Sequence, residues 1–395
     1  MTTKAISDLL PSAKAIEREL IDLRRKFHRN PELSFEEAET AAAVAELLSG
    51  LGLEVRTGIG GHGVVADLTG DRPGPRIALR ADMDALPIQE ETDLPYASEK
   101  PGKMHACGHD AHTAILYGAA KLLSERKDQL AGSVRFIFQS AEEINAGAKA
   151  MIEQGVLEGV DEIFGLHNLP TLSAGKAGTR YGALMGSVDK FELTITGQGG
   201  HGAIPDQCID PVVAASAIIL SLQSAVSREI SPFDPVVVTV GSIHGGASYN
   251  VIPERVELSG TVRTFSKSVQ ETMPSRLLRL ISETAEAYRC KAELRYTQHV
   301  PVLVNHDDQV RHAEDAIDLI LSSENRIEAN PTLAGEDFSV YLQHVPGCFF
   351  WLGSGPENGA EQAYGLHHPK FSINEDCLAV GASLLAAISI TRLGA

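Results

Sequence analysis

Apolar positions in the early part of the chain recur every three or four residues, which is the spacing of a helix. Residues 13–28 place apolar side chains at this spacing among many charges and predict an amphipathic helix. Asn30-Pro31 ends it, because the residue before a proline avoids helical backbone angles. Ser34 with Glu37 has the spacing of a capping box and predicts a second helix to about Leu51.

Short apolar runs then alternate with helical patterns. Strands are predicted at residues 63–68, 76–81, 133–139, 162–166 and 347–352, and helices at residues 110–127, 145–154, 306–321 and 374–390. Strands that alternate with helices are typical of a parallel sheet covered on both faces. The sequence therefore predicts an α/β domain with a mostly parallel central sheet.

The middle of the chain follows a different pattern, in which apolar and polar positions alternate from residue 187 as in a half-exposed strand. The predicted order is strand 187–196, helix 210–226, strand 236–242, strand 255–263, helix 269–288 and strand 291–296. This β-α-β-β-α-β order is the ferredoxin-like pattern. We therefore predict a discontinuous α/β domain, residues 1–184 and 298–395, with a ferredoxin-like α+β domain inserted at residues 185–297.

The charge balance limits the partners. The chain carries 34 basic and 52 acidic side chains, a formal net charge of −18 at pH 7. A surface of this charge repels phosphate backbones and anionic lipids. We therefore expect neither nucleic acid nor a membrane as a partner.

The cysteines and the apolar stretches indicate the cellular compartment of the protein. The five cysteines stand at positions 107, 208, 290, 348 and 377. An odd number at wide spacing does not fit a disulfide framework and favours a reducing compartment. No signal peptide is visible in residues 1–20, and polar residues or glycines interrupt residues 211–226 and 377–390 before roughly 18 apolar residues accumulate. We predict a cytoplasmic protein.

Residues 104–112 read Met-His-Ala-Cys-Gly-His-Asp-Ala-His and lie just before a predicted helix. Cys107 and His109 can point the same way in an extended segment, because side chains there alternate with a period of two. Thiolate and imidazole are both good ligands for borderline metals such as Zn²⁺. The alternative is a polar loop with a reduced core cysteine, but so many ligand types together favour a metal site.

The pair Glu142 and Glu143 follows the predicted strand 133–139 directly. Adjacent carboxylates point in different directions, so one can bind a metal while the other removes a proton from metal-activated water. The alternative is a solvated pair at a helix start, where negative charge is favourable.

Other candidate ligands also follow strands. His167 ends the strand at 162–166, and the neighbours His367 and His368 precede Pro369. A lone histidine in such places can equally be a structural hydrogen-bonding residue. Residues 80–84 read Arg-Ala-Asp-Met-Asp, and their carboxylates could orient a ligand histidine or bind metal themselves. Because ligands gather at the carboxyl ends of strands in open α/β sheets, we expect these side chains to converge.

The chain resembles the M20 metallopeptidase family. The matching segments are residues 28–34, 80–87, 104–112, 141–143, 165–168, 199–201, 249–253, 260–263 and 335–338. They occur in the family's order across nearly the whole chain. The 104–112 motif is similar to that of the branch containing N-acyl-amino-acid amidohydrolases, hippurate hydrolases, auxin-conjugate hydrolases and acetyl-diaminopimelate deacetylases.

The resemblance implies roles for individual residues. Two divalent metal ions (Zn, or Co, Mn or Ni) would be held by Cys107, His109, Glu143, His167 and His367. Glu142 would be the general base, and Asp84 a carboxylate that orients a ligand. His201 would act on the oxyanion and on the substrate, together with the substrate-binding Asn250 and Arg263. The spacing to Pro369 favours His367 over His368 as the ligand.

The implied activity is metal-dependent hydrolysis of the amide bond of N-acyl amino acids, by a water held between the metals and activated by Glu142. The resemblance also implies a homodimer or homotetramer formed through the inserted domain, which would close over a small acylated amino acid or short peptide. The alternatives are a dipeptidase, a carboxypeptidase or an acetyl-diaminopimelate deacetylase of the same family. A non-catalytic metal-binding scaffold and a single structural zinc are the other possibilities.

Overall fold

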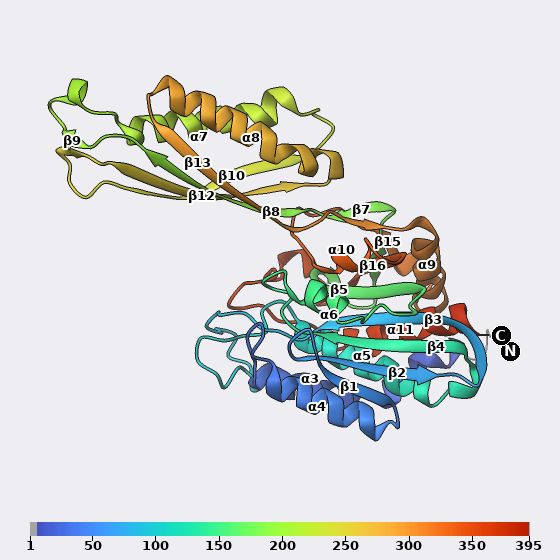
Figure 1. Ribbon diagram of the computed structural model, residues 1–395. Helices are drawn as coiled ribbons and strands as arrows, with labels where there is room; N and C mark the ends of the chain where they lie inside the picture. Colours follow the sequence, from blue (N-terminus) through green and yellow to red (C-terminus); the bar gives the residue numbers. More distant parts are fainter. Residues whose placement is uncertain (1–5, 395) are drawn as a thin grey trace. The chain divides into compact units, whose positions relative to one another are not determined.

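A central sheet of eight strands organises the first of two units of the chain. The computed structural model describes residues 6–394 (Figure 1). The first unit runs to Leu184 and continues at Val304–Asn330 and from Asp337 onward. The second comprises Met185–Leu303 and Pro331–Glu336, where the sequence had suggested residues 185–297.

The eight strands lie in the order β1-β2-β4-β3-β5-β16-β6-β15. Their bounds are β1 (Glu54–Ile59), β2 (Gly63–Thr69), β3 (Arg72–Asp82), β4 (Ala131–Gln139), β5 (Glu162–Ser173), β6 (Ala177–Thr179), β15 (Arg326–Glu328) and β16 (Gly347–Gly355). The four central strands β4, β3, β5 and β16 are parallel, while β1 and β2 extend the sheet antiparallel. The predicted α/β class with a mostly parallel centre is confirmed.

The helices of this unit bury the sheet. They are α2 (Leu9–Ala15), α3 (Glu17–Arg29), α4 (Ala38–Gly50), α5 (His109–Ser124), α6 (Gly147–Glu153), α9 (Asp307–Leu321), α10 (Phe338–Tyr341) and α11 (Cys377–Leu393), with short 3-10 turns η1 (Lys127–Gln129), η3 (Ser323–Asn325) and η4 (Ala360–Gln362). Helices α5 and α11 are apolar on nearly every side, as expected of helices inside a core. They pack on each other and on the central strands, and Gly118 allows the close approach.

One local prediction is wrong. Helix α4 does form, but Ser34 and Glu37 do not cap it, since Glu37 makes no side-chain capping hydrogen bond. The carboxylate of Glu32 takes that place and accepts from the backbone N–H groups of Glu39 and Thr40 at 3.1 and 2.8 Å. Ser34 and Glu37 are therefore available for other contacts in the first unit.

The second unit is a four-stranded antiparallel sheet with two helices on one face (Figure 1). Its elements are β8 (Val188–Thr196), β9 (Gly200–His201), η2 (Pro205–Gln207), α7 (Pro211–Glu229), β10 (Val236–Gly245), β11 (Val251–Ile252), β12 (Arg255–Thr264), α8 (Lys267–Ala287) and β13 (Lys291–Val300). The sheet order is β10-β12-β8-β13, so the predicted β-α-β-β-α-β sequence of elements is present. The strands β7 (Gly182–Met185) and β14 (Leu303–Asn305) pair where the chain passes between units.

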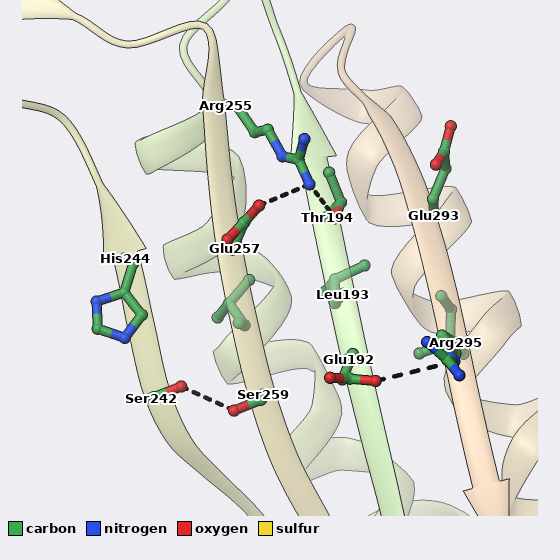
Figure 2. A pocket seen from close by; sticks show the side chains of 12 residues that line it. Glu192, Leu193, Thr194, Ser242, His244, Arg255, Glu257, Ser259, Glu293 and Arg295 are labelled. Carbon is green, nitrogen blue, oxygen red and sulfur yellow. Dashed lines mark hydrogen bonds and ion pairs between the residues drawn. The ribbon is translucent and has the colours of Figure 1, made fainter.

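The face of this sheet without helices is polar. Alternate residues of β8 point to opposite sides, so Phe191 and Leu193 are buried under the helices and Glu192 lies on the other face. Figure 2 shows that face, a hollow of about 540 Å³ in which Arg255 pairs with Glu257 at 2.6 Å. The hollow is lined by charges that largely neutralise one another, and no candidate metal-binding group of the described residues lies there.

Candidate metal centre

The candidate metal centre lies at the carboxyl ends of the parallel strands in the first unit. Strand β3 ends at Asp82, which is paired with Gln139 at the end of β4, and His167 lies on β5. Helix α5 begins at His109, two residues after Cys107. The convergence expected from the strand order is therefore present.

Gly108 lets the ligand segment approach β5 closely. Its φ of +87° lies in the left-handed region, and an added Cβ would stand 2.2 Å from Nδ2 of Asn168. That same nitrogen donates to the backbone carbonyl of Cys107 at 2.6 Å. The glycine thus allows Asn168 to fix the backbone that carries Cys107.

Two groups of potential ligands share one residue. Cys107, His109 and His167 form one group, and Cys107, Glu143 and His367 form the other, with the ligand atoms of each group within 4.8 Å of one another. Cys107 Sγ lies 3.4 Å from His167 Nε2, and Glu143 Oε2 lies 3.5 Å from His367 Nε2. Two ligand groups with a common thiolate can hold two metal ions side by side.

Hydrogen bonds fix which ring nitrogen of each histidine faces the centre. His109 Nδ1 donates to Asp84 Oδ1 at 3.2 Å, and His167 Nδ1 donates to the carbonyl of Asn168 at 2.8 Å. When each ring is neutral, its Nε2 carries the lone pair that a metal needs. Asp84 also accepts from Ser34 Oγ at 2.7 Å and from the backbone N–H of Glu143 at 3.0 Å, so it braces several parts of the centre.

Two buried polar atoms fit a bound cation. His109 Nε2 and Glu143 Oε1 lie 3.9 Å apart, and neither has a hydrogen-bond partner among the described residues. A buried polar atom without a partner costs about 1–3 kcal/mol. A cation between them would satisfy both, so the residues present fit the metal that the family resemblance implies.

Charge in the centre also favours a cation. Burial alone would lower the pKa of His109, but the carboxylates of Asp82 and Asp84 outweigh it and raise that pKa to about 10. Burial raises the pKa of Glu143 to about 7, and Asp84 adds to this effect. These are the shifts expected where negative charge exceeds positive charge in a buried site.

Metal binding should therefore release protons. At pH 8 the His109 ring is protonated, because its pKa is about 10, and the proton must leave before Nε2 can bind a metal. The affinity for Zn²⁺ should rise with pH, by about tenfold per pH unit for each proton displaced. Calorimetry at pH 8 in buffers of different ionisation enthalpy should show at least one proton released per chain. Asp84→Asn should release fewer, and equal release by both proteins would contradict this origin of the His109 shift.

A third group, Asp82 with His109 and His112, does not make a further ligand of His112. His112 Nδ1 bonds to Asp82 Oδ1 at 2.6 Å, and its Nε2 accepts from the backbone N–H of Asn168 at 2.9 Å. Both ring nitrogens are thus occupied, and the ring stacks on His109 with centroids 5.4 Å apart. His112 therefore supports the centre through its contacts with Asp82, Asn168 and His109 and does not act as a ligand.

Glu142 lies beside the ligands. Its carboxylate is grouped with His109 and Glu143 within 4.8 Å, and the residue is 7% exposed. The backbone N–H of Asp337 donates to Glu142 Oε1 at 3.4 Å. The carboxylate is therefore held next to the atoms that would bind metal.

Of the two neighbouring histidines, the structure brings His367 into the centre. Its backbone N–H donates to the carbonyl of Ala106 at 2.8 Å, and its φ of +64° turns the chain in the left-handed region. His368 instead stacks on Tyr364 with centroids 4.4 Å apart. The side chain of His367 is 53% exposed, so this side of the centre is open to solvent.

The other predicted site residues lie in the second unit. His201 in β9 pairs with Val251 in β11, and the carbonyl of Asn250 accepts from the N–H of Gly202 at 2.8 Å, so His201 and Asn250 are neighbours. Arg263 lies near the far end of β12, where its Nε donates to Thr261 Oγ1 at 3.1 Å. At about 3.3 Å per residue, the length of β12 separates Arg263 from the pair by roughly 25 Å within this unit.

Comparison with known proteins places the chain in a family. The model of peptidase family M20/M25/M40 matches residues 78–390. An N-acetylcysteine deacetylase of Bacillus subtilis is 43% identical over 96% of this chain and 98% of its own length. The thermostable carboxypeptidase 2 of Saccharolobus solfataricus is 39% identical over 98% of both chains.

A solved structure agrees with the fold. The Bacillus subtilis YXEP protein, described as a dinuclear metal-binding peptidase of the M20 family, superimposes with a TM-score of 0.85 at 40% identity, over 96% of this chain and 99% of that one. The chain therefore belongs to peptidase family M20/M25/M40, as predicted. Within that family it is a metal-dependent hydrolase of amide bonds.

Proposed function

We propose that this protein hydrolyses the amide bond of small N-acylated amino acids and releases a carboxylic acid and a free amino acid. The observation that carries the proposal is the pair of ligand groups sharing Cys107, with the carboxylate of Glu142 beside them. The similarity to an N-acetylcysteine deacetylase over nearly the whole chain supports an acylated amino acid as the substrate.

Five side chains are the proposed ligands of two metal ions. Cys107, His109 and His167 would hold one metal, and Cys107, Glu143 and His367 the other. When bound, two divalent cations lower the pKa of a water from about 15.7 toward 7 and polarise the substrate carbonyl. The mixture of sulfur, imidazole and carboxylate donors suits Zn²⁺ and also Co²⁺, Mn²⁺ or Ni²⁺.

Glu142 is the proposed general base. Its carboxylate would take the proton of the attacking water and then deliver it to the leaving amine, so that one residue serves both steps. The hydrogen bond from the Asp337 N–H orients this carboxylate. Asp84 would keep His109 in the tautomer that exposes Nε2.

The second unit would supply the remaining contacts. We assign His201 as the donor to the developing oxyanion, where losing one donor typically costs about 10²–10³ in rate. Asn250, its neighbour, and Arg263 would hold the substrate, and because the length of β12 separates them, His201 and Asn250 would come from one copy of the chain and Arg263 from another. The unit would act as a lid that closes over substrate.

The second unit also carries a candidate contact between copies of the chain. Large apolar side chains are exposed on α7 and β10, namely Val212, Val213, Leu220, Val237 and Ile243. Among the described residues, α7 is the one helix long and apolar enough to cross a membrane, which is weak evidence for a span. An exposed apolar face of this kind marks a protein interface, and we propose a homodimer or homotetramer of a cytoplasmic protein.

That assembly makes a direct prediction. The wild-type chain should have at least the mass of a dimer in light scattering at micromolar concentration. Leu220→Glu should shift it toward monomer, because Leu220 is 74% exposed and a charge there would be buried by a partner. Leu319→Glu on α9 of the first unit, 47% exposed, is the matched control and should leave the mass unchanged. A monomeric wild-type protein would contradict the proposed interface.

A peptidase that acts on unblocked peptides is the second candidate. The similarity to a thermostable carboxypeptidase over 98% of both chains favours it. Both activities need the same metals and the same base, so the centre alone does not separate them. They differ in whether the substrate presents an acylated or a free amine.

A substrate panel tests the proposal. Purified protein loaded with Zn²⁺, Mn²⁺ or Co²⁺ would be assayed on N-acetyl and N-benzoyl amino acids and on unblocked dipeptides of the same residues. We expect higher kcat/KM on the acylated set, loss of activity with a chelator, and recovery when metal is restored. Faster cleavage of the free dipeptides would favour the second candidate, and no cleavage of either set would remove both.

A further inference from the structure

The loop that carries the two glutamates, residues 140–147, has a strained backbone. Ala141 and Asn145 have φ values of 57° and 56°, in the left-handed region, which costs an alanine about 1–3 kcal/mol and is tolerated better by asparagine. At the end of the loop, a Cβ on Gly147 would lie 1.7 Å from the carbonyl oxygen of Ser140. Such a backbone keeps its shape only when surrounding groups hold it.

The carboxylate of Asp337 joins the two ends of this loop. Its Oδ1 and Oδ2 accept from Nε2 of Gln139 at 2.9 and 2.8 Å, and Oδ2 also accepts from the backbone N–H of Ala148 at 2.9 Å. Gln139 is the last residue of β4, just before the loop, and Ala148 lies in α6, just after it. Asp337 is 1% exposed, so water does not compete for these bonds.

Arg80 completes the clamp. Its Nη2 donates to Asp337 Oδ1 at 2.8 Å and its Nε donates to Gln139 Oε1 at 3.0 Å, which orients the amide of Gln139 toward Asp337. The guanidinium also pairs with Asp82. Because Arg80 is fully buried, its planar fork holds these groups in one geometry.

The backbone of Asp337 reaches the glutamate itself. The same residue that ties Gln139 to Ala148 donates its N–H to Glu142 Oε1 at 3.4 Å. On another side of the loop, the buried Glu37 accepts from the N–H of Ala141 at 2.8 Å. The loop is therefore held at its start, at its end and at the carboxylate that points to the ligands.

We propose that Asp337 is a positioning residue for Glu142, acting through its clamp on Gln139 and Ala148. The inference rests on the proposed function, in which Glu142 is the general base. In this role Asp337 contacts neither substrate nor metal, although its carboxylate forms a further candidate metal-binding group with Glu142 and Glu336, with ligand atoms within 4.8 Å of one another. It fixes the direction of the base, and a displacement of about 1 Å can cost about 10²-fold in rate.

Asp337→Asn tests the clamp with little change in size. The new amide nitrogen would face the N–H of Ala148 and the amide of Gln139, so donors would oppose donors. Asp67→Asn is the matched control. Asp67 lies on β2 and pairs bidentately with Arg135, which is on β4 like Gln139 but away from the loop. Both variants weaken an ion pair with an arginine, which is buried for Asp337 and part-buried for Asp67, and only Asp337 contacts the loop.

We expect Asp337→Asn to lower kcat by about 10–100-fold with KM and metal content near those of the wild type, and Asp67→Asn to leave kcat within about twofold. Hydrogen exchange of metal-free protein should show faster exchange in residues 140–148 for Asp337→Asn alone. An unchanged kcat for Asp337→Asn, an equal loss in Asp67→Asn, or loss of metal would overturn the proposal.

A milder variant keeps the test open if Asp337→Asn does not fold. Tyr341→Phe removes the phenolic hydroxyl that donates to Gln139 Oε1 at 3.0 Å and should lower kcat by a smaller factor, with the same local rise in exchange. Unchanged kcat and exchange in this variant would also count against the clamp. Glu142→Gln separates the two hypotheses: if it stays active, the proposed base is wrong, whereas an inactive Glu142→Gln beside a fully active Asp337→Asn rejects only the clamp.

Discussion

Glu142→Gln is expected to lower kcat by about 10²–10⁴-fold while both ligand groups keep their residues. The amide cannot take a proton from water, but its shape preserves the bond from the N–H of Asp337. Metal analysis should still show two ions per chain, and KM should change little. Turnover on the best substrate of the panel and metal content by mass spectrometry measure the two effects.

The control for this variant is another glutamate of the same region. Glu153→Gln at the end of α6 changes an exposed carboxylate 66% open to solvent and should leave both kcat and metal content unchanged. A Glu142→Gln protein with near wild-type turnover would show that another group removes the proton. Loss of metal in that variant would instead assign Glu142 as a ligand.

Cys107→Ala should have the largest effect on metal content, because Cys107 belongs to both ligand groups. Its removal should lower the affinity for each metal ion by more than the roughly 10–100-fold that is lost when a group supporting a ligand is removed. We expect the ions per chain to fall from two to one or none, with activity lost in step. His367→Ala removes a ligand of only one group and should leave one ion bound.

A buried cysteine elsewhere provides the matched control. Cys377→Ala in α11 also removes a buried thiol, but this residue belongs to none of the described metal-binding groups. It should keep two ions and normal turnover after a modest loss of stability from the small cavity. Two ions in Cys107→Ala, or a single ion in the wild type, would contradict the shared centre, and the latter would favour a structural zinc.

The sequence was informative where chemistry depends on neighbouring residues. The ligands follow apolar runs that read as strands, and parallel strands bring their carboxyl ends to one edge, so the convergence of Cys107, Glu143 and His167 could be expected. The choice of His367 over His368 rested on the spacing to Pro369 and fits the geometry. The α/β class followed from the alternation of strands and helices.

Contacts between distant residues could not be found in this way. Gln139 and Asp337 are far apart in the chain, and no local pattern pairs them. Ser34 and Glu37 have a capping-box spacing, but one bonds to Asp84 and the other to the N–H of Ala141. Polar side chains near a helix start can cap the helix or bond to distant residues, and here both residues do the latter.

The division of the chain has a practical consequence for truncation. The chain passes from one unit to the other after Leu184, Leu303, Asn330 and Glu336. Deleting Met185–Leu303 would leave Pro331–Glu336 without the neighbours it packs with, including the backbone of Gly186, which donates to Thr332 and Ala334. A fragment that keeps only the metal centre therefore needs both segments of the second unit removed, with a short linker joining Asn330 to Asp337.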